Sequence, residues 1–554
     1  MKTENGIQTV GLTGTAALTA IGLMMAAPAW AQDRQTIVHG ADEEPATLDP
    51  AEVEPGEGGE AIIFQVYERL LSVGPDSPEL LPALATTVPT IENGLISEDG
   101  LTFRFPLREG VTFHDGSPFT ADDVKFSWDR VISLSLPGSG AEILSDRVVE
   151  TRVIDDYTFE VEIAEPDASF LYSAVLPTTA SIVSQEAVEA NGGDADGEPN
   201  EFMAGNMVGT GPYTFVSWNR TENLTLEVNE GYWGTPANDN VRLEMGVDPD
   251  VRVLGLRAGE FDTIETDPSY IADFEGMDGV EIYSEGLLLE PLHIGFNMNV
   301  PEGALPEGDT IPEDFFADVR IRQAFNYAFN YDAFINGALA GFGEVNPHYV
   351  PIGVFGYDPE APRYDTQDLA KAEELFRETG YWDSGFTATV IVESGSLFEI
   401  QALILKDSIE GLNPDLRINV LGVAEAVFDE ALAQSPLNYA MWAKNGDPAA
   451  DPIDYLQTYS HPDGEWGEVH GFRSGYGDPD AIADLIDAAA VELDRTARAG
   501  MISELQTLLY EDPMWLIGAQ EGVVTAYRDR IEGMVIQPLW PRPSINFAIL
   551  DKTN

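Results

Sequence analysis

Residues 99–124 read DGLTFRFPLREGVTFHDGSPFTADDV. Apolar and polar side chains alternate over residues 101–105, which predicts a strand with one buried face. An Asp-Gly pair opens the stretch and a second one begins at Asp115, and such pairs are typical of tight turns. Thr120 is suited to cap a helix over residues 121–131. The stretch therefore predicts strand, turn and helix in close succession, as in a mixed α/β fold.

The rest of the chain repeats this mixture. Short β-rich runs at residues 35–39 and 157–163 predict further strands. Residues 60–71 and 368–379 have helical periodicity, and Gly380 is a suitable stop for the second helix. We find no internal repeat of about 20–50 residues. The expected fold class is α/β.

Length and composition indicate a large protein of more than one lobe. The chain has 554 residues, of which 44% are hydrophobic and 10% aromatic. Single hydrophobic cores usually stop growing beyond about 250–300 residues. The mean hydropathy of -0.11 leaves no surplus of apolar residues for a protein with many membrane spans.

The first residues are typical of a secretory signal peptide. Lys2 precedes a weakly apolar run over residues 10–27, and the small-residue exit ends at Ala31. A membrane anchor is the alternative, but the run contains several Gly and Thr and is short of about 20 strongly apolar residues. We predict a signal peptide at residues 1–31, cleavage before Gln32 and a periplasmic location. Without any cysteine, the mature chain has no N-terminal Cys to carry a lipid and no disulfides.

The charge is strongly negative. Lys and Arg total 28 against 96 Asp and Glu, which gives a net charge of -68. This sign excludes nucleic acid as a partner. The acids are spread along the chain and few of the cations are Lys, which favours a saline habitat, because a Debye length of ~3 Å at 1 M salt screens self-repulsion. We expect a halophilic or salt-adapted bacterium.

Residues 99–124, together with the preceding VYERL and PALA segments, closely resemble the signature of family 5 extracellular solute-binding proteins. These proteins serve ABC importers of dipeptides, oligopeptides and nickel complexes. The resemblance continues in order along the chain at GTGPY (209–213), NEGYW (229–233), VRIRQAFNYA (319–328) and NGDP (445–448).

The resemblance implies a bilobal periplasmic-binding-protein fold with a hinge and an extra subdomain in lobe I. We place lobe I at residues 32–292 with a return at 518–554, lobe II at 293–517, and the extra subdomain at about 76–215. Such a protein closes its lobes on a small-molecule or peptide ligand and delivers it to an ABC permease in the inner membrane. We expect a monomer without catalytic residues, cofactor or metal site.

Three alternatives are weighed against this prediction. A secreted hydrolase would need a Gly-x-Ser-x-Gly elbow, a His-Glu-x-x-His site or a Cys nucleophile, and the sequence has none of them. The six histidines form no close pair at helical spacing, so side chains are not expected to bind nickel directly, whereas a nickel chelate stays open. A ligand receptor for a sensor also stays open.

The resemblance also implies where the ligand binds. The loop after Leu48-Asp49-Pro50 points to Val53, Glu54 and Gly56. A second contact falls near Glu142. The third region is residues 441–448, and the full set of expected ligand-binding residues is Val53, Glu54, Gly56, Glu142, Glu393, Trp442, Lys444 and Asn445.

The third region departs from peptide-binding relatives. They carry a Trp followed by an Asp that pairs with the peptide ammonium, whereas Lys444 or Asn445 stands there in this chain. No cation lies beside Glu393, where relatives have an Arg for the dipeptide carboxylate. We predict that the ligand is not an ordinary dipeptide but directs an anionic or hydroxyl-rich group at Lys444 and an apolar face at Trp442. The alternative is that Lys444 points to solvent.

Overall fold

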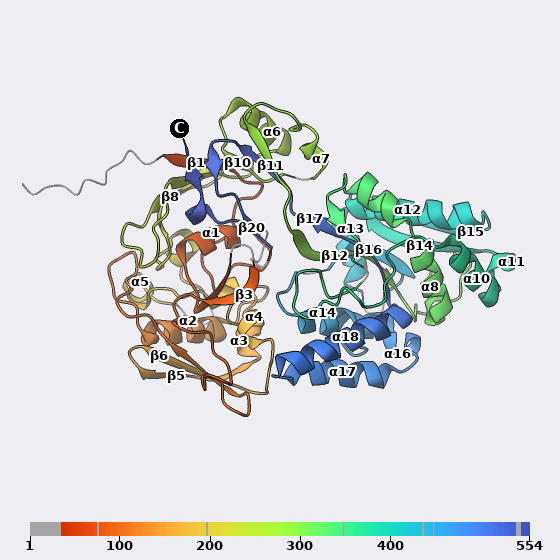
Figure 1. Cartoon of the computed structure of the whole chain (residues 1–554), viewed down its shortest axis with the longest axis horizontal. Coiled ribbons are helices and arrows are strands. Elements are labelled where there is room, and N and C mark those ends of the chain that lie inside the picture. Colours follow the sequence, from red (N-terminus) through yellow and green to blue (C-terminus); the bar gives the residue numbers. More distant parts are fainter. Residues whose placement is uncertain are drawn as a thin grey trace, which may run out of the picture.

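A computed structural model describes residues 35–553 except 75–76, 195–197, 267, 347, 435–436, 447 and 539–543. The predicted signal peptide lies outside the described residues. Figure 1 shows two lobes side by side, each built around its own sheet and joined by strands that run from one lobe to the other. The prediction of a bilobal α/β fold is confirmed. Within the described ranges, no helix is both long and apolar enough to cross a bilayer.

Lobe I is built on a seven-stranded sheet of order β11-β18-β10-β1-β9-β8-β7. Its central strand β1 runs parallel to both neighbours, β9 and β10. Apolar side chains from this sheet pack against α1, and Ile37 and Ile63 are fully buried there. The bounds are β1 (Thr36–Gly40), α1 (Gly58–Val66), β7 (Tyr213–Asn219), β8 (Asn223–Val228), β9 (Asn240–Glu244), β10 (Thr263–Ile264), β11 (Val280–Tyr283) and β18 (Thr525–Arg528).

A separate three-stranded antiparallel sheet lies within the range predicted for the extra subdomain, formed by β4 (Thr102–Pro106), β5 (Val148–Asp155) and β6 (Thr158–Ile163). Helix α2 (Ala121–Leu134) packs against it through Trp128, which is fully buried with its ring edge-on to Phe159. Thr120 and Asp123 form a capping box at the start of α2. The predicted helix and its cap are therefore confirmed.

Lobe II is built on a six-stranded sheet of order β13-β17-β12-β16-β14-β15. Its apolar face carries a large core that includes many aromatic rings, such as Phe325 and Trp515. The strands are β12 (Leu287–Phe296), β13 (Gly343–Glu344), β14 (Phe386–Glu393), β15 (Leu416–Val423), β16 (Met441–Asn445) and β17 (Trp515–Gly522).

Helices cover this sheet and form the side of lobe II that faces the subdomain (Figure 1). The predicted helix over residues 368–379 is α10, capped by Asp368 and ended by Gly380 at φ +83°. The helices of this lobe are α8 (Val319–Ala328), α9 (Tyr331–Ala333), the π-helical turn η4 (Phe334–Ala338), α10 (Leu369–Thr379), α11 (Tyr381–Ser384), α12 (Leu397–Leu412), α13 (Glu425–Leu432), α14 (Pro452–Tyr459), α15 (Glu465–His470), α16 (Phe472–Gly475), α17 (Pro479–Val491) and α18 (Arg495–Glu511), with the 3₁₀ turn η3 (Phe315–Ala317).

The remaining elements are short. They are β2 (Leu71–Gly74), β3 (Ser77–Pro82), α3 (Glu142–Ser145), α4 (Phe170–Ser173), η1 (Thr178–Ala180), α5 (Gln185–Ala190), η2 (Met203–Gly205), α6 (Pro249–Ala258), α7 (Pro268–Ile271), β19 (Ile531–Glu532), β20 (Ile536–Gln537), β21 (Ser544–Ile545), η5 (Phe547–Ile549) and β22 (Asp551–Lys552).

The chain passes between the lobes at the ends of two paired strands. Strand β12 follows β11 after residues 284–286, and β17 is followed by β18 after residues 523–524. Because β12 and β17 pair with each other in the lobe II sheet, both connections leave that lobe at the same place. The boundaries we predicted at 292/293 and 517/518 lie inside these two strands. Short links next to a rigid strand pair are suited to act as a hinge.

Candidate binding cleft

A cavity of about 560 Å³ lies between the lobes. Its walls come from the start of α1 in lobe I, from the subdomain around α3 and α4, and from β12, β16 and α14 in lobe II. Cavities of about 300–1,000 Å³ are the usual size for small-molecule sites. Because its walls come from both lobes, the volume of the cavity depends on the angle between the lobes.

The lobe I wall is the turn that leads into α1. Gly56 adopts φ +88°, a conformation that favours glycine, and its N–H donates to Glu60 Oε2 at 2.7 Å. Glu60 lies in the first turn of α1 and is only 3% exposed. A carboxylate at a helix N-terminus is stabilised by the helix dipole, so this wall presents a fixed negative group.

The lobe II wall is formed by β16, β12 and α14. Asn445 lies at the end of β16 and donates through its amide to Glu290 Oε2 on β12 at 2.7 Å. The hydroxyl of Tyr455, on α14, donates to the carbonyl of Leu289 at 2.6 Å. This bond holds α14 against β12, and Asp454 and Glu290 thus belong to the same wall.

Two carboxylates near the start of helix α14, Asp451 and Asp454, have different roles. Asp451 caps the helix by accepting from the N–H of Ile453, and the same carboxylate binds Arg498 through two bonds of 2.6 and 2.8 Å. One turn later, Asp454 faces the cavity and accepts a hydrogen bond from the Ser173 hydroxyl at 2.7 Å. The two acids differ in burial and in their partners, a cation for Asp451 and a neutral hydroxyl for Asp454.

The Asp454 bond also connects the lobes, because Ser173 ends α4 of the subdomain, which faces α14 in Figure 1. A second link is the backbone N–H of Ala168, which donates to the carbonyl of Ala490 at 2.9 Å. Burial and the nearby Asp451 carboxylate raise the pKa of Asp454 to about 7, although Ser173 and Arg147 act in the opposite direction. Asp454 is therefore partly protonated near neutral pH.

Arg147 is the only Lys or Arg among the described residues that line the cavity. Its Nε lies 3.0 Å from Asp167 Oδ2, and its Nη1 donates to the carbonyl of Ile143 at 3.3 Å. The positive charge of this side chain is therefore already compensated by the subdomain.

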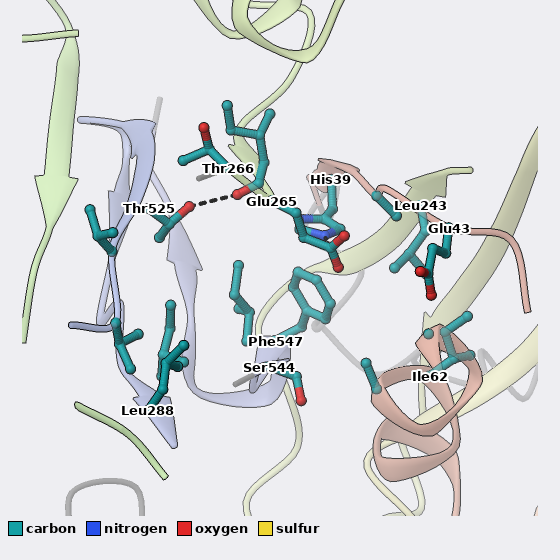
Figure 2. A pocket seen from close by; sticks show the side chains of 18 of the residues that line it. His39, Glu43, Ile62, Leu243, Glu265, Thr266, Leu288, Thr525, Ser544 and Phe547 are labelled. Atoms are coloured by element: carbon teal, nitrogen blue, oxygen red, sulfur yellow. Dashed lines mark hydrogen bonds and ion pairs between the residues drawn. The ribbon is translucent and has the colours of Figure 1, made fainter. Parts of the chain in front are cut away.

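A second cavity of about 250 Å³ lies at the hinge end of lobe I. Figure 2 shows His39, Glu265 and Phe547 gathered on one of its sides, with Leu288 and Thr525 across from them. His39 Nδ1 lies 2.9 Å from Thr263 Oγ1, and its Nε2 lies 3.8 Å from Glu265 Oε1. Burial opposes ionisation of Glu265, but His39 and the Asp42 N–H hold the pKa of this acid below its usual value. These polar groups are thus satisfied within lobe I.

An open depression of about 480 Å³ shares lining residues with both cavities, Gly56 with the first and Glu43 with the second. Lobe I therefore presents a continuous hollow surface along the residues that precede and begin α1.

Residues 79–467 match the family model described as "Bacterial extracellular solute-binding proteins, family 5 Middle". The chain belongs to this family. Members of the family bind solutes for transport and are not enzymes. Because members of the family bind solutes, the cavity between the lobes is the expected place for a solute.

Individual relatives agree with this assignment. The chain is 26% identical to the dipeptide-binding protein of Escherichia coli, with 96% of this chain and 97% of the relative covered. It is also 26% identical to the glutathione-binding protein GsiB of Pectobacterium atrosepticum, with 93% and 94% covered. The solved structure of HbpA2 from Haemophilus parasuis superposes with a TM-score of 0.78 at 23% identity, covering 94% of this chain and all of that one.

Two of the expected ligand-binding residues of this family 5 protein line the cavity, Gly56 and Asn445. Glu142 is exposed and directly precedes Ile143, which does line the cavity. Glu54 is exposed beside Gly138, whereas Val53 is 1% exposed in the lobe I core.

The expected role of Trp442 does not fit its position. Its side chain is fully buried in the lobe II core, where it stacks on Trp466 at 4.6 Å and donates through Nε1 to His470 Nε2 at 2.9 Å. His293 and Trp515 meet the same ring edge-on. No ring face is open to a ligand, and Trp442 instead anchors β16 in the core.

Lys444 and Glu393 also lie away from the cavity lining. Successive side chains of a strand point to opposite faces, so Lys444 is on the face of β16 opposite to Asn445, the residue that lines the cavity. Lys444 pairs in register with His293. Glu393 ends β14. Lys444 is thus not among the residues that line this cavity, and the anionic ligand group directed at it stays a prediction.

Sequence reasoning missed most of the polar cavity residues. Those missed are Glu60, Arg147, Tyr172, Ser173, Thr179, Glu290 and Asp454. Asp454 gave no distinctive signal, because an acid in the first turn of a helix is ordinary. Among the described residues, no group of three or more His, Asp or Glu is placed to hold a metal ion.

Proposed function

We propose that this chain is the periplasmic substrate-binding component of an ABC importer. It captures a small polar or peptide-like solute between its lobes and delivers the closed form to a permease in the inner membrane. The observation that supports this most strongly is the cavity of about 560 Å³ whose walls come from both lobes. A ligand that contacts both walls binds the closed form better, and so shifts the population toward it.

The two short hinge links give this motion a physical basis. Residues 284–286 and 523–524 leave the same strand pair, so small changes in their backbone angles rotate the lobes as rigid bodies. The names of the dipeptide-binding and glutathione-binding relatives support a peptide-like solute. A monomer is sufficient for this mechanism, because one chain supplies all walls of the cavity.

Replacement of Ala449 by Trp tests this function, because Ala449 lines the cavity and a large side chain there would fill it. The solute that copurifies with the wild type is released by denaturation and identified by mass spectrometry. We expect Ala449→Trp to carry none of it and to unfold like the wild type. Ala433→Trp, at an exposed alanine of the same lobe, is the matched control. Equal solute content in all three proteins would contradict the proposal.

We also propose that the protein is exported and cleaved before Gln32. The Ala29-Trp30-Ala31 exit supports this proposal, as does membership of an extracellular family. The intact mass of the secreted protein is expected to match a chain that begins at Gln32. A retained N-terminal segment would contradict it.

Finally, we propose that the acidity is an adaptation to salt. The net charge of -68 must be screened for the fold to be fully stable. The thermal midpoint is expected to rise between about 0.05 and 2 M NaCl, where the Debye length shrinks from more than 10 Å to about 2–3 Å. A midpoint that stays flat or falls would rule out this explanation.

A further inference from the structure

Asp454 differs from the buried aspartates that stabilise the fold. What this difference implies for the ligand rests on the proposed function, in which the cavity between the lobes is the solute site. Three fully buried aspartates lie within hydrogen-bond distance of a cation: Asp49 is 2.6 Å from Arg130, Asp451 is 2.6 Å from Arg498, and Asp262 is 2.7 Å from Lys552. Asp454 accepts only the Ser173 hydroxyl from the described residues, and no described cation lies within ion-pair distance of it.

The number of acids around the cavity does not decide the charge of the ligand. The charged lining residues that the structure describes are Glu60, Arg147, Glu290 and Asp454, and a chain with 96 acids and 28 bases would show such a ratio by chance. The informative fact is local. Asp49, Asp262 and Asp451 each have an Arg or Lys partner, whereas at Asp454, which lines the cavity, the fold supplies a hydroxyl.

Among the described residues, the one cation of the lining already has an acidic partner. Arg147 is held by Asp167 at 3.0 Å and by the carbonyl of Ile143. An anionic ligand group would have to share the Arg147 guanidinium with Asp167. The described part of the lining therefore offers acceptors on both walls, at Glu60 in lobe I and at Glu290 and Asp454 in lobe II, while its one cation, Arg147, already has a carboxylate partner.

We propose that the captured solute carries a cationic group that binds the Asp454 carboxylate, and that it is a net cation rather than a zwitterion held at both ends. When the lobes close, the cavity loses water, and an ionised carboxylate in such a place needs an opposite charge nearby. A ligand ammonium or guanidinium supplies that charge. The ligand then completes the ion pair that the fold leaves incomplete.

The ionisation of Asp454 determines whether ligand binding releases or takes up protons, and this proton change can be measured. Its pKa of about 7 arises from burial and from the Asp451 and Asp167 carboxylates, while Arg147 and the Ser173 hydroxyl lower it. A ligand cation within about 4–6 Å lowers the pKa of a carboxylate. Binding of a cation at pH 7 therefore releases protons, and affinity rises with pH between 6 and 8. An anionic ligand would have the opposite effect.

The experiment uses four matched probes: alanyl-phenylalanine amide, alanyl-phenylalanine, N-acetyl-alanyl-phenylalanine, and the N-acetyl amide. They carry net charges of +1, 0, -1 and 0, and share the same side chains. Calorimetry at pH 7 in buffers of different ionisation enthalpy gives both affinity and proton count. We expect the +1 amide to bind best with proton release, and Asp454→Asn to weaken it at least about 30-fold and abolish the release. Glu393→Gln removes an acid outside the cavity lining and is expected to change neither.

The opposite results overturn the inference. These are stronger binding of the N-acetyl acid or of the zwitterion, proton uptake, or an Asp454→Asn variant that binds the amide as well as the wild type. If none of the four probes binds, the charge of the copurifying solute decides, with a net cation in support and a neutral or anionic solute against. A protein that binds no probe and carries no solute contradicts the proposed function itself. This outcome differs from those that contradict only the cationic ligand.

Discussion

Two carboxylates on α14, one helical turn apart, serve different purposes. Asp451 is 1% exposed, caps the helix and is held by Arg498 through two bonds. Asp454 lines the cavity between the lobes and is held by a single hydroxyl from the opposite lobe. The first contributes to the folded state of lobe II alone, and the second can change its partner when the lobes move or a solute arrives.

This difference shows how a binding group can be recognised in a very acidic chain. Neither the presence of an acid nor its burial is informative when 96 acids are available. The counter-charge is informative, because a buried charge without an opposite charge nearby is costly, and groups with a shifted pKa gather at functional sites.

The largest effect is expected for Asp451→Asn. Removing one partner of a buried ion pair leaves Arg498 without its counter-charge, and we expect a loss of about 3–5 kcal/mol in the free energy of unfolding. Asp454→Asn is the matched substitution and is expected to lose less than about 1 kcal/mol at pH 8, since no paired cation is left behind. Denaturant titration of both variants measures the difference. Equal losses would mean that Asp454 is also a structural acid.

The pH dependence of the free energy of unfolding is expected to distinguish Asp454 from Asp451. The pKa of Asp454 is raised to about 7 by burial and by Asp451, so the folded state binds more protons than the unfolded state from about pH 4 to 7. Stability contributed by the protonated form is present at low pH and is lost as pH rises, by at most about 1.4 kcal/mol per pH unit. The stability of Asp454→Asn relative to wild type is therefore expected to increase from pH 5 to 8.

Denaturant titrations at pH 5, 6, 7 and 8 check this trend, with Glu393→Gln as the control that should remain parallel to the wild type. A constant difference between Asp454→Asn and the wild type over this range would show that Asp454 ionises at its ordinary pKa.

A smaller effect is expected for Ser173→Ala. This change removes one of the described hydrogen bonds that join the subdomain to lobe II. Such a bond contributes about 0.5–1.5 kcal/mol, so the closed fraction without solute should fall by roughly 2–10-fold. Because the chain has no cysteine, Cys at Glu92 and Glu378, both exposed, can carry a dye pair for fluorescence energy transfer. Ser474→Ala is the control, and an unchanged distance distribution in Ser173→Ala would show that this bond has no part in closure.

The sequence predicted elements whose signals are local. Helix α2 followed from its cap, Thr120, and α10 followed from the helical pattern of residues 368–379 and the stop at Gly380. Both helices are confirmed, although α2 extends to Leu134, beyond the predicted end. These signals depend on neighbours within a few residues. The bilobal arrangement came from the family resemblance and not from such patterns.

The cleft could not be predicted in the same way, because its contacts join distant residues. Ser173 and Asp454 are 281 residues apart. Lys444 and Asn445 are adjacent, yet strand geometry turns them to opposite faces, so an uncertainty of one residue changed the predicted ligand contact. Trp442 is buried because Trp466 and His470 of α15 cover it, and nothing near Trp442 in the sequence indicates that cover.

The most direct test is a crystal structure of the closed protein with the solute that it carries on purification. The solute is expected between Gly56 and Asn445, with a cationic group within about 4 Å of the Asp454 carboxylate, the distance over which charged groups form an ion pair. Electron density for the solute in the hinge cavity beside His39 and Phe547, or next to Lys444, would contradict the account. A carboxylate of the solute bound to Arg147 in place of Asp167 would contradict it equally.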